Sequence, residues 1–384
     1  MTSSNNPVIL QVIPALDAGG AERTAIDIAA ALARDGFQAL VASEGGRLEP
    51  QLAEAGAELV RLPLDTKAPQ RMLANALRLA QLIRTRKVSL IHARSRAPAW
   101  SALMAARRTA IPFVATYHGI YNAGHPLKRF YNSVMVRGDA VIANSNWTAD
   151  HIVREHGVPP ARITVIHRGV DLEAFDPAGI APARIDALRS QWGAAQGETI
   201  ILLPGRLTRW KGQLVLIEAL AQLARAGALA NVKAVLAGDA QGRNAYMAEL
   251  KSAIARYGLG GIVRIAPHIV DMPAAYLASD IVVSASTDPE AFGRVAAEAG
   301  AMARPVIATD HGGARETVLA GRSGLLVPPG DAAALAAALQ TVLAMDTDGR
   351  RRLGEAGRAH VRENFSLDRM CADTLALYRA LLRR

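Results

Sequence analysis

Cysteine is almost absent from this sequence of 384 residues, in which Cys371 is the single example. One cysteine excludes an internal disulfide and a cysteine-rich metal site. No run of about 18 apolar residues occurs, so the sequence predicts no transmembrane helix. Residues 1–20 lack a basic segment followed by a long apolar core, so we expect no signal peptide and a cytoplasmic protein.

Acidic side chains are missing from residues 66–138, where every charged residue is basic, in a chain of net charge +10. This asymmetry indicates an anionic partner, which is a phosphorylated substrate, an anionic membrane surface or nucleic acid. A solvated basic face explains the pattern equally well. Nucleic acid is disfavoured, because the stretch has neither base-stacking aromatic residues between its charges nor a nucleic-acid-binding motif.

Strand-like and helix-like segments alternate along the chain, which favours an α/β fold with parallel sheets. Pro177 and Pro182 interrupt the alternation and predict a linker between two domains, 1–176 and 177–365. The first series has strands at 7–14, 37–43, 88–93, 112–118 and 140–145, with helices at 21–36 and 71–86. The second has strands at 199–205, 232–238, 262–267, 280–286 and 305–310, a helix at 331–345 and a last helix at 366–384. Two doubly wound domains predict a central cleft, with ligands at the carboxyl ends of the strands.

Two carboxylates, Glu290 and Glu298, flank the start of a predicted helix near Phe292 or Gly293. The free N–H groups of a helix start suit a phosphate, and carboxylates suit hydroxyl groups because they accept hydrogen bonds. The order carboxylate, anion site, carboxylate matches the sugar, diphosphate and ribose of a nucleotide sugar. Glu298 alone is a common helix residue and would indicate nothing.

Three further segments follow predicted strands and support this interpretation. Arg206 and Lys211 in "GRLTRWKG" offer two cations to a diphosphate, unless they are ordinary surface residues. Gly19 and Gly20 permit close approach of a ligand, unless they only form a turn. His118 in "TYHGIYN" is predicted to bond a sugar hydroxyl or handle a proton, unless it is a satisfied buried histidine.

Together these segments resemble the retaining glycosyltransferases of family 4, which have the GT-B fold of two Rossmann-like domains facing a central cleft. The strongest match is "PEAFGRVAAEAGAMARPVIATDHGGARETVLAGRSGLLVPPGD", in which Glu290 and Glu298 stand as the E-x7-E pair. "GRLTRWKG" and "GGAE" match in order and position. The resemblance also implies that the helix at 366–384 packs back on the first domain.

The resemblance assigns a role to each matching residue. It implies that Glu290 contacts the transferred sugar, that Glu298 holds the ribose, and that His118 lies beside the reacting centre. The remaining donor contacts would come from side chains or backbone groups of Gly19, Gly20, Arg206, Lys211, Ile269, Phe292, Gly293 and Arg294.

The sequence departs from the family pattern where many members have a His-x-His pair. Here His92 is followed by Arg94 in "IHARS". We interpret Arg94, with Arg96 and Tyr117, as acceptor-side residues, and the extra cation as a hint of an anionic acceptor. Ala303 replaces a frequent glycine and should be tolerated.

The sequence therefore predicts a retaining hexosyltransferase that uses a UDP- or GDP-linked sugar and a glycan or glycolipid acceptor, as in lipopolysaccharide core synthesis. We expect a peripheral enzyme at the inner face of the cytoplasmic membrane. No metal or other cofactor is expected, because Arg206 and Lys211 replace a metal's charge and no Asp-x-Asp motif stands where it would serve one. A sugar-nucleotide epimerase and a non-catalytic nucleotide-sugar-binding protein stay open as alternatives. A nicotinamide dehydrogenase is disfavoured by the missing G-x-G-x-x-G fingerprint.

Overall fold

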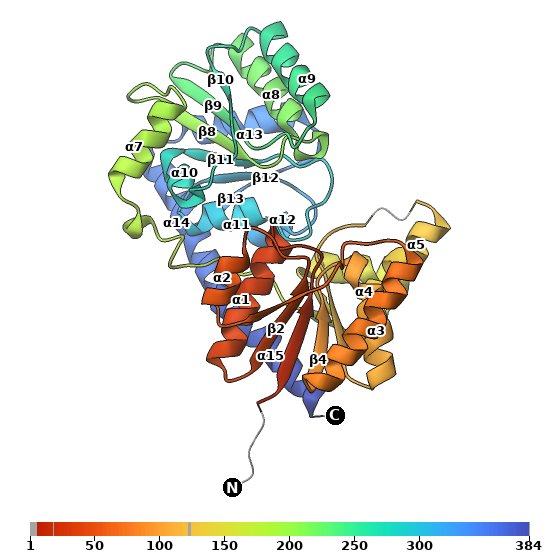
Figure 1. Ribbon diagram of the computed structural model, residues 1–384. Coiled ribbons are helices and arrows are strands. Elements are labelled where there is room, and N and C mark those ends of the chain that lie inside the picture. The colour runs from red at the N-terminus through yellow and green to blue at the C-terminus, as the bar shows by residue number, and fades with distance from the viewer. Residues whose placement is uncertain (1–5, 18, 122–123, 384) are drawn as a thin grey trace. The chain divides into compact units, whose positions relative to one another are not determined.

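The computed structural model describes residues 6–17, 19–121 and 124–383, and divides into two units (Figure 1). The first unit contains Met1–Gly169 and Leu367–Arg384, and the second contains Val170–Ser366. The division falls before residue 176, because Val170 pairs with Ser366 and its N–H donates to the carbonyl oxygen of Phe365 at 2.8 Å. Residues 1–5 and 384, which belong to the predicted first domain and last helix, lie outside the described residues.

The first unit is built on a seven-stranded sheet of order β3-β2-β1-β4-β5-β6-β7. Each strand pairing in its described residues is parallel. The strands are β1 (Val8–Val12), β2 (Gln38–Ser43), β3 (Glu58–Arg61), β4 (Val88–Ala93), β5 (Phe113–Tyr117), β6 (Ala140–Ala143) and β7 (Ile163–Val165).

Helices cover both faces of this sheet, because successive strand residues point to opposite sides. Leu10 of β1 packs with helices α3 and α4, whereas Ile9 packs with α1 and α15. The helices are α1 (Gly20–Arg34), α2 (Glu49–Glu54), α3 (Pro69–Thr85), α4 (Arg96–Thr109), α5 (Pro126–Asn132), α6 (Asn146–His156) and α15 (Leu367–Leu382), with short 3-10 turns at η1 (Ser133–Val136) and η2 (Pro160–Arg162). The last helix therefore supplies part of the first unit's core, through Met370, Cys371, Leu375, Tyr378 and Leu381.

The second unit repeats this plan on a six-stranded parallel sheet of order β10-β9-β8-β11-β12-β13. Its strands are β8 (Thr199–Pro204), β9 (Val232–Ala237), β10 (Val263–Ala266), β11 (Ile281–Ser284), β12 (Val306–Thr309) and β13 (Gly324–Val327). The order places β8, β11 and β12 side by side at its centre. Because the strands are parallel, the loops that follow these three strands meet at one edge of the sheet.

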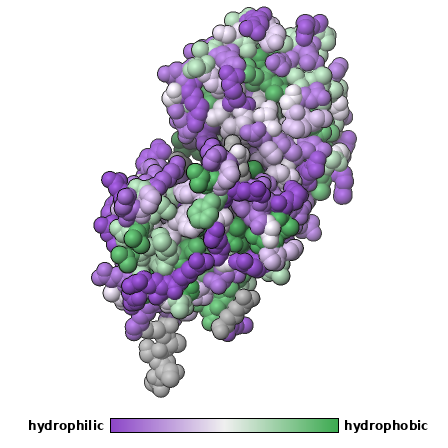
Figure 2. Space-filling model, turned by 90° about the vertical axis from the view of Figure 1, so that its right-hand side faces the viewer, coloured by the Kyte–Doolittle hydropathy of each residue, from purple (hydrophilic) through white to green (hydrophobic). Residues whose placement is uncertain are grey.

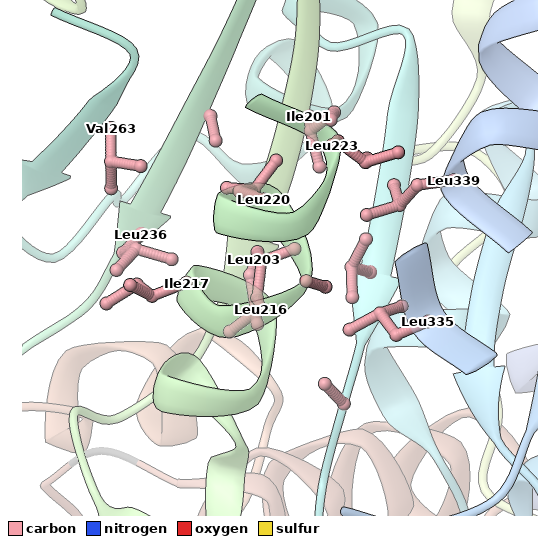
Figure 3. Close-up of a cluster of buried hydrophobic side chains, with 14 of the residues drawn as sticks. Ile201, Leu203, Leu216, Ile217, Leu220, Leu223, Leu236, Val263, Leu335 and Leu339 are labelled. Atoms are coloured by element: carbon pink, nitrogen blue, oxygen red, sulfur yellow. The ribbon is translucent and has the colours of Figure 1, made fainter. Parts of the chain in front are cut away.

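Two apolar layers sandwich the second sheet. Figure 3 shows Leu203 of β8 among leucines of α8 and α13, while Leu202 packs on the opposite face with Tyr276 of α10. The helices are α7 (Pro182–Gln191), α8 (Gln213–Arg225), α9 (Asn244–Arg256), α10 (Met272–Ala278), α11 (Arg294–Ala301), α12 (Ala314–Thr317), α13 (Ala332–Ala344) and α14 (Thr347–Asn364), with 3-10 turns η3 (Pro177–Gly179) and η4 (Arg209–Lys211). These two sandwiches confirm the predicted α/β class with two Rossmann-like domains.

Among the described residues, no helix is both long enough and apolar enough to cross a membrane.

Candidate active site

The loop after β8 presents Lys211 at the carboxyl edge of the second sheet. The chain leaves the strand at Gly205 (φ +145°), forms the turn η4 and returns at Gly212 (φ +73°), a left-handed conformation that favours glycine. Buried Gln213 holds the loop, since its Nε2 donates to the carbonyl oxygen of Arg206 at 3.0 Å. The fold thus fixes the backbone that carries both predicted cations.

Lys211 forms a shielded ion pair with Glu290. Its Nζ donates to Oε1 of Glu290 at 2.7 Å, and the two side chains are only 13% and 15% exposed. The hydroxyl of Ser286 donates to the same oxygen at 2.5 Å. Within the described part of the chain, no side chain or backbone group donates to the other oxygen, Oε2. One face of this carboxylate is therefore anchored and the other is available to a ligand.

Burial and charge act in opposite directions on Glu290. Burial alone would raise the pKa of its carboxyl group, but the charge and hydrogen bond of Lys211, the hydrogen bond of Ser286 and the nearby His311 bring that pKa below its ordinary value. Glu290 is consequently an anion at neutral pH and a hydrogen-bond acceptor only.

Backbone hydrogen bonds hold the loop that carries Glu290 on both sides of that residue. The N–H of Thr287 donates to the carbonyl oxygen of Trp210 at 2.7 Å, and that of Gly313 donates to the carbonyl oxygen of Glu290 at 2.8 Å. A Cβ atom at Gly312 or Gly313 would overlap the backbone of residues 290–292. The glycine pair after β12 therefore permits a close approach of two loops.

Helix α11 begins at Arg294, directly after this turn. Its N-cap residue is Gly293, in the left-handed region at φ +85°, and no side chain caps the helix. A glycine N-cap leaves room for a ligand beside the backbone N–H groups of the first turn, and such groups suit a bound anion.

Glu298 lies one turn into α11 and is 7% exposed. Its Oε1 accepts from Nε of Arg294 at 2.8 Å, and its Oε2 accepts from the hydroxyl of Tyr276 at 2.9 Å. Burial first, and then the charge of Glu298, raises the pKa of Tyr276 well above its ordinary value, so the tyrosine remains a donor. Tyr276 thereby orients Glu298, and each carboxylate oxygen keeps capacity for a second hydrogen bond.

Of the other residues predicted to bind the nucleotide sugar in the second unit, two are buried and one is exposed. Phe292 and Ile269 are buried, and the ring of Phe292 meets that of Phe365 edge-on at 5.5 Å, so only their backbones are candidates for ligand contact. Arg206 is exposed. The Trp210 ring lies 5.9 Å from the guanidinium of Arg206 and 4.5 Å from Nζ of Lys211, so it links the two cations.

In the first unit, Gly20, His118 and Arg168 come together at the carboxyl ends of β1, β5 and β7. Nη2 of Arg168 lies 3.0 Å from Nδ1 of His118, and a Cβ atom on Gly20 would overlap Nη1 of the same guanidinium. Gly19 is the N-cap of α1, and a side chain there would overlap the carboxylate of Glu22. The predicted residues are neighbours, although the arginine that joins them was not predicted.

Two of the three acceptor-side residues are in the interior of the first unit, which corrects our expectation. Tyr117 is fully buried with Phe113 and Ala115, and burial raises the pKa of its hydroxyl. Arg94 is 3% exposed, and its Nε donates to Oε1 of Gln11 at 2.5 Å. Neither side chain is presented at the surface, so Arg94 no longer supports an anionic acceptor.

Arg96, the third of these residues, is half-buried at the first position of α4. Its Nη1 donates to Oδ1 of Asn132 at 2.7 Å, and its guanidinium stacks on the ring of Tyr121 at 4.1 Å. It remains an acceptor-side candidate.

Sequence reasoning missed four residues that complete these clusters: Ser286, Tyr276, Trp210 and Arg168. Trp210 lies within the quoted motif "GRLTRWKG" and Ser286 ends the predicted strand at 280–286, so both could have been found there. Tyr276 and Arg168 act on residues distant in the sequence, on Glu298 and His118, and only the fold brings them together.

Comparison with known proteins places both units in one group of enzymes. Residues 18–174 match the family described as Glycosyltransferase Family 4, and residues 184–360 match Glycosyl transferases group 1. A D-inositol 3-phosphate glycosyltransferase of Xylanimonas cellulosilytica is 34% identical over 297 residues, which cover 73% of this chain and 69% of that protein.

Solved structures resemble the whole chain. A glycosyltransferase of Rickettsia africae has a TM-score of 0.90 and 36% identity, and the match covers 99% of this chain and 100% of that one. Alr3699/HepE of Anabaena, solved in complex with UDP and glucose, has a TM-score of 0.84 and 27% identity, with 98% of this chain and 100% of that one covered.

Proposed function

Because the chain belongs to family 4 of the glycosyltransferases and has the GT-B fold, we propose that it transfers a hexose from a nucleotide-diphosphate sugar to an acceptor hydroxyl with retention of configuration. We propose UDP-glucose as the first donor to test, since the similar Anabaena protein was solved with UDP-glucose.

One observation carries this proposal, namely the anchored pair of Lys211 and Glu290, which joins the loops after β8 and β11. The pair holds a cation beside a carboxylate whose Oε2 is available to sugar hydroxyls. The start of α11, with Gly293 as its N-cap, and the exposed Arg206 add positive potential in the same unit. Diphosphate would bind these positive groups, and Glu298 would accept hydrogen bonds from the ribose.

The chemistry that we propose needs no metal. When the bond between the anomeric carbon and the diphosphate oxygen breaks, negative charge grows on the diphosphate, and Lys211 and Arg206 would stabilise it. The acceptor oxygen would attack from the face that the diphosphate leaves, and the acceptor proton would pass to the diphosphate. This front-face course retains the configuration without a covalent enzyme intermediate.

A panel of nucleotide sugars tests the proposal. We expect nucleoside diphosphate to be released in an acceptor-dependent way from one donor, with UDP-glucose first, and turnover to be unchanged by EDTA. An interconversion of the donor without an acceptor would instead identify an epimerase. Binding without turnover would identify a sugar-binding protein, and loss of turnover in EDTA would contradict metal independence.

For the acceptor, we propose a cell-surface glycan or glycolipid hydroxyl, such as that of lipopolysaccharide core. A second candidate is an inositol phosphate, because several curated relatives are named as D-inositol 3-phosphate glycosyltransferases. Radiolabelled sugar transfer to inositol 3-phosphate or to extracted glycolipid distinguishes these acceptors by the size and charge of the product.

A surface of the first unit that combines apolar residues with the exposed Lys128 and Arg129 of α5 supports association with an anionic membrane. Exposed Leu73 and Leu77 lie on α3, and exposed Leu127 and Phe130 lie on α5. Trp100 of α4 connects the helices, because its ring stacks on Phe130 at 5.2 Å and the next residue, Ser101, donates to Met72. Figure 2 faces this side of the unit and shows hydrophobic areas among hydrophilic ones.

Vesicle flotation tests the membrane proposal. We expect recovery with phosphatidylglycerol vesicles and little recovery with phosphatidylcholine vesicles, because each lysine or arginine near an anionic surface contributes about 1 kcal/mol. Lys128→Glu and the double variant Leu127→Ser/Phe130→Ser should each reduce recovery severalfold. Tyr257→Ser, which removes an exposed aromatic ring from the second unit, is the control. Equal recovery on both vesicle types would exclude charge-dependent association.

A further inference from the structure

Arg168 occupies a specific position between helix α1 and His118. It follows β7 and the buried Ile166, and its guanidinium fills the space that the absent side chain of Gly20 leaves. From there its Nη2 reaches Nδ1 of His118 at 3.0 Å. All three residues belong to the first unit.

The direction of this hydrogen bond follows from chemistry. A guanidinium group has five N–H donors and no acceptor, so Nδ1 of His118 must accept. A neutral imidazole carries one proton, which is then on Nε2. Burial, followed by the charges of Arg168 and Arg94, lowers the pKa of His118 well below its ordinary value, so the ring is neutral at pH 7.

The second ring nitrogen has no partner of its own. Nε2 of His118 is buried, and no group in the described part of the chain forms a hydrogen bond with it. Leaving a buried N–H group without an acceptor is energetically unfavourable, so such groups are rarely left unpaired. A ligand oxygen next to Nε2 would satisfy this N–H.

We propose that Arg168 is a positioning residue that fixes His118 as a hydrogen-bond donor through Nε2, directed at a hydroxyl oxygen of a sugar ligand bound at this edge of the first unit. This inference rests on the proposed function for the identity of the ligand. It decides between the two roles that the sequence left open for His118.

His118 is then no general base in the transfer. A base needs a lone pair on the nitrogen that faces the substrate, and the contact with Arg168 places that lone pair on Nδ1 instead. In the transfer step, the acceptor oxygen bonds to the anomeric carbon, the bond to the diphosphate breaks, and the acceptor proton moves to the diphosphate. The Nε2 proton of His118 stays in place throughout.

The tautomer can be measured directly on the full chain labelled with ¹⁵N-histidine. Long-range ¹H–¹⁵N correlation spectra distinguish a protonated ring nitrogen from an unprotonated one, and a spectrum of His118→Gln identifies the signals of His118. We expect an unprotonated Nδ1 and a protonated Nε2 at pH 7. A proton on Nδ1, or on both nitrogens, would overturn the proposal.

Arg168→Met removes the donor, whereas Arg168→Lys retains one. We expect the methionine variant to give a mixture of His118 tautomers and the lysine variant to restore the wild-type pattern. Gly20→Ala should act like Arg168→Met, because the added methyl group displaces the guanidinium without altering either partner. Gly119→Ala, next to His118 with nothing within 4 Å of its new methyl group, is the control. An unchanged tautomer in both Arg168→Met and Gly20→Ala would show that Arg168 does not fix the ring.

Kinetics supply a separate readout. Arg168→Met should lower kcat by about 10- to 100-fold, the effect of one misdirected hydrogen bond, with little change in KM for the donor. Equal changes in kcat for Arg168→Met and Arg168→Lys would contradict a positioning role. If no donor supports turnover, the proposed function fails, while the spectra still test the role of Arg168.

Discussion

Lys211→Met is expected to lower kcat/KM for the nucleotide sugar by about 10²- to 10³-fold, which is the usual effect of removing one preorganised charge from a transition state. The lysine is only 13% exposed and is held by Glu290 at 2.7 Å, so solvent screens its charge weakly. Methionine keeps the unbranched apolar chain as far as the ε position and removes the charge. The measurement is steady-state release of nucleoside diphosphate.

Glu290→Gln tests whether the two residues act as a unit. If Glu290 anchors the ammonium group as well as the sugar, the double variant Lys211→Met/Glu290→Gln should have a kcat/KM only slightly below that of Lys211→Met. The effects of the two single substitutions will then not add. Arg209→Met is the matched control, because Arg209 is the neighbouring cation of the same turn and forms an exposed pair with Glu249. If Arg209→Met lost as much activity as Lys211→Met, the effect would come from the net positive charge of the turn and not from a specific contact of Lys211.

Gly212→Ala is expected to destabilise the second unit more than any ordinary glycine replacement. Gly212 is buried, and a Cβ atom there would overlap the carbonyl oxygen of Ala285, a backbone atom that cannot rotate away. We expect the free energy of unfolding to fall by about 2–4 kcal/mol. About 1–2 kcal/mol of this reflects the left-handed backbone, and the rest reflects the steric overlap. Urea unfolding followed by circular dichroism measures this loss.

Gly227→Ala separates the two contributions. Gly227 has nearly the same backbone angle, φ +69° against +73° for Gly212, but nothing lies within 4 Å of its new methyl group. Gly227→Ala should therefore lower the free energy of unfolding by only about 1–2 kcal/mol. Because Gly212 follows Lys211 directly, Gly212→Ala should also weaken UDP binding in calorimetry, whereas Gly227→Ala should not. Equal losses of stability in the two variants would refute the packing explanation.

The sequence predicted the interior strands and the edge strand β10 (Val263–Ala266), but it missed the other three edge strands. Strands such as β1 and β8 are buried on both faces, so they appear as continuous apolar runs. β3, β7 and β13 lie at the ends of their sheets, are only three or four residues long and contain half-buried positions. Their short and mixed patterns are indistinguishable from loops without the neighbouring strand.

Periodicity could have corrected one site residue but not the other. Tyr117 ends β5 in the same alternation as Phe113 and Ala115, so its burial was readable from the sequence. Arg94 lies after β4 in register with His92, on the face that α15 covers, and the hydroxyl of Tyr378 lies 2.5 Å from Nδ1 of His92. That cover comes from the far end of the chain, which no local pattern reveals.

Arg168 was missed for a related reason. Pro177, Pro182 and nearby glycines made residues 163–185 look like a linker, whereas the chain first completes β7 and places Arg168 beside His118. The motifs of the second unit, by contrast, lie within single loops. Lys211 and Glu290 were accordingly predicted to bind one ligand, and the structure brings them into direct contact.

The position of α15 has a consequence for biosynthesis. Residues up to Gly169 leave the ribosome long before Leu367, yet the core of their unit needs Tyr378 and Leu381. Because α1 covers only part of that face of the first sheet, the part that α15 covers must remain exposed while the whole second unit is made. A nascent chain stalled before α15 should bind chaperones through that face and lose them once the last helix emerges.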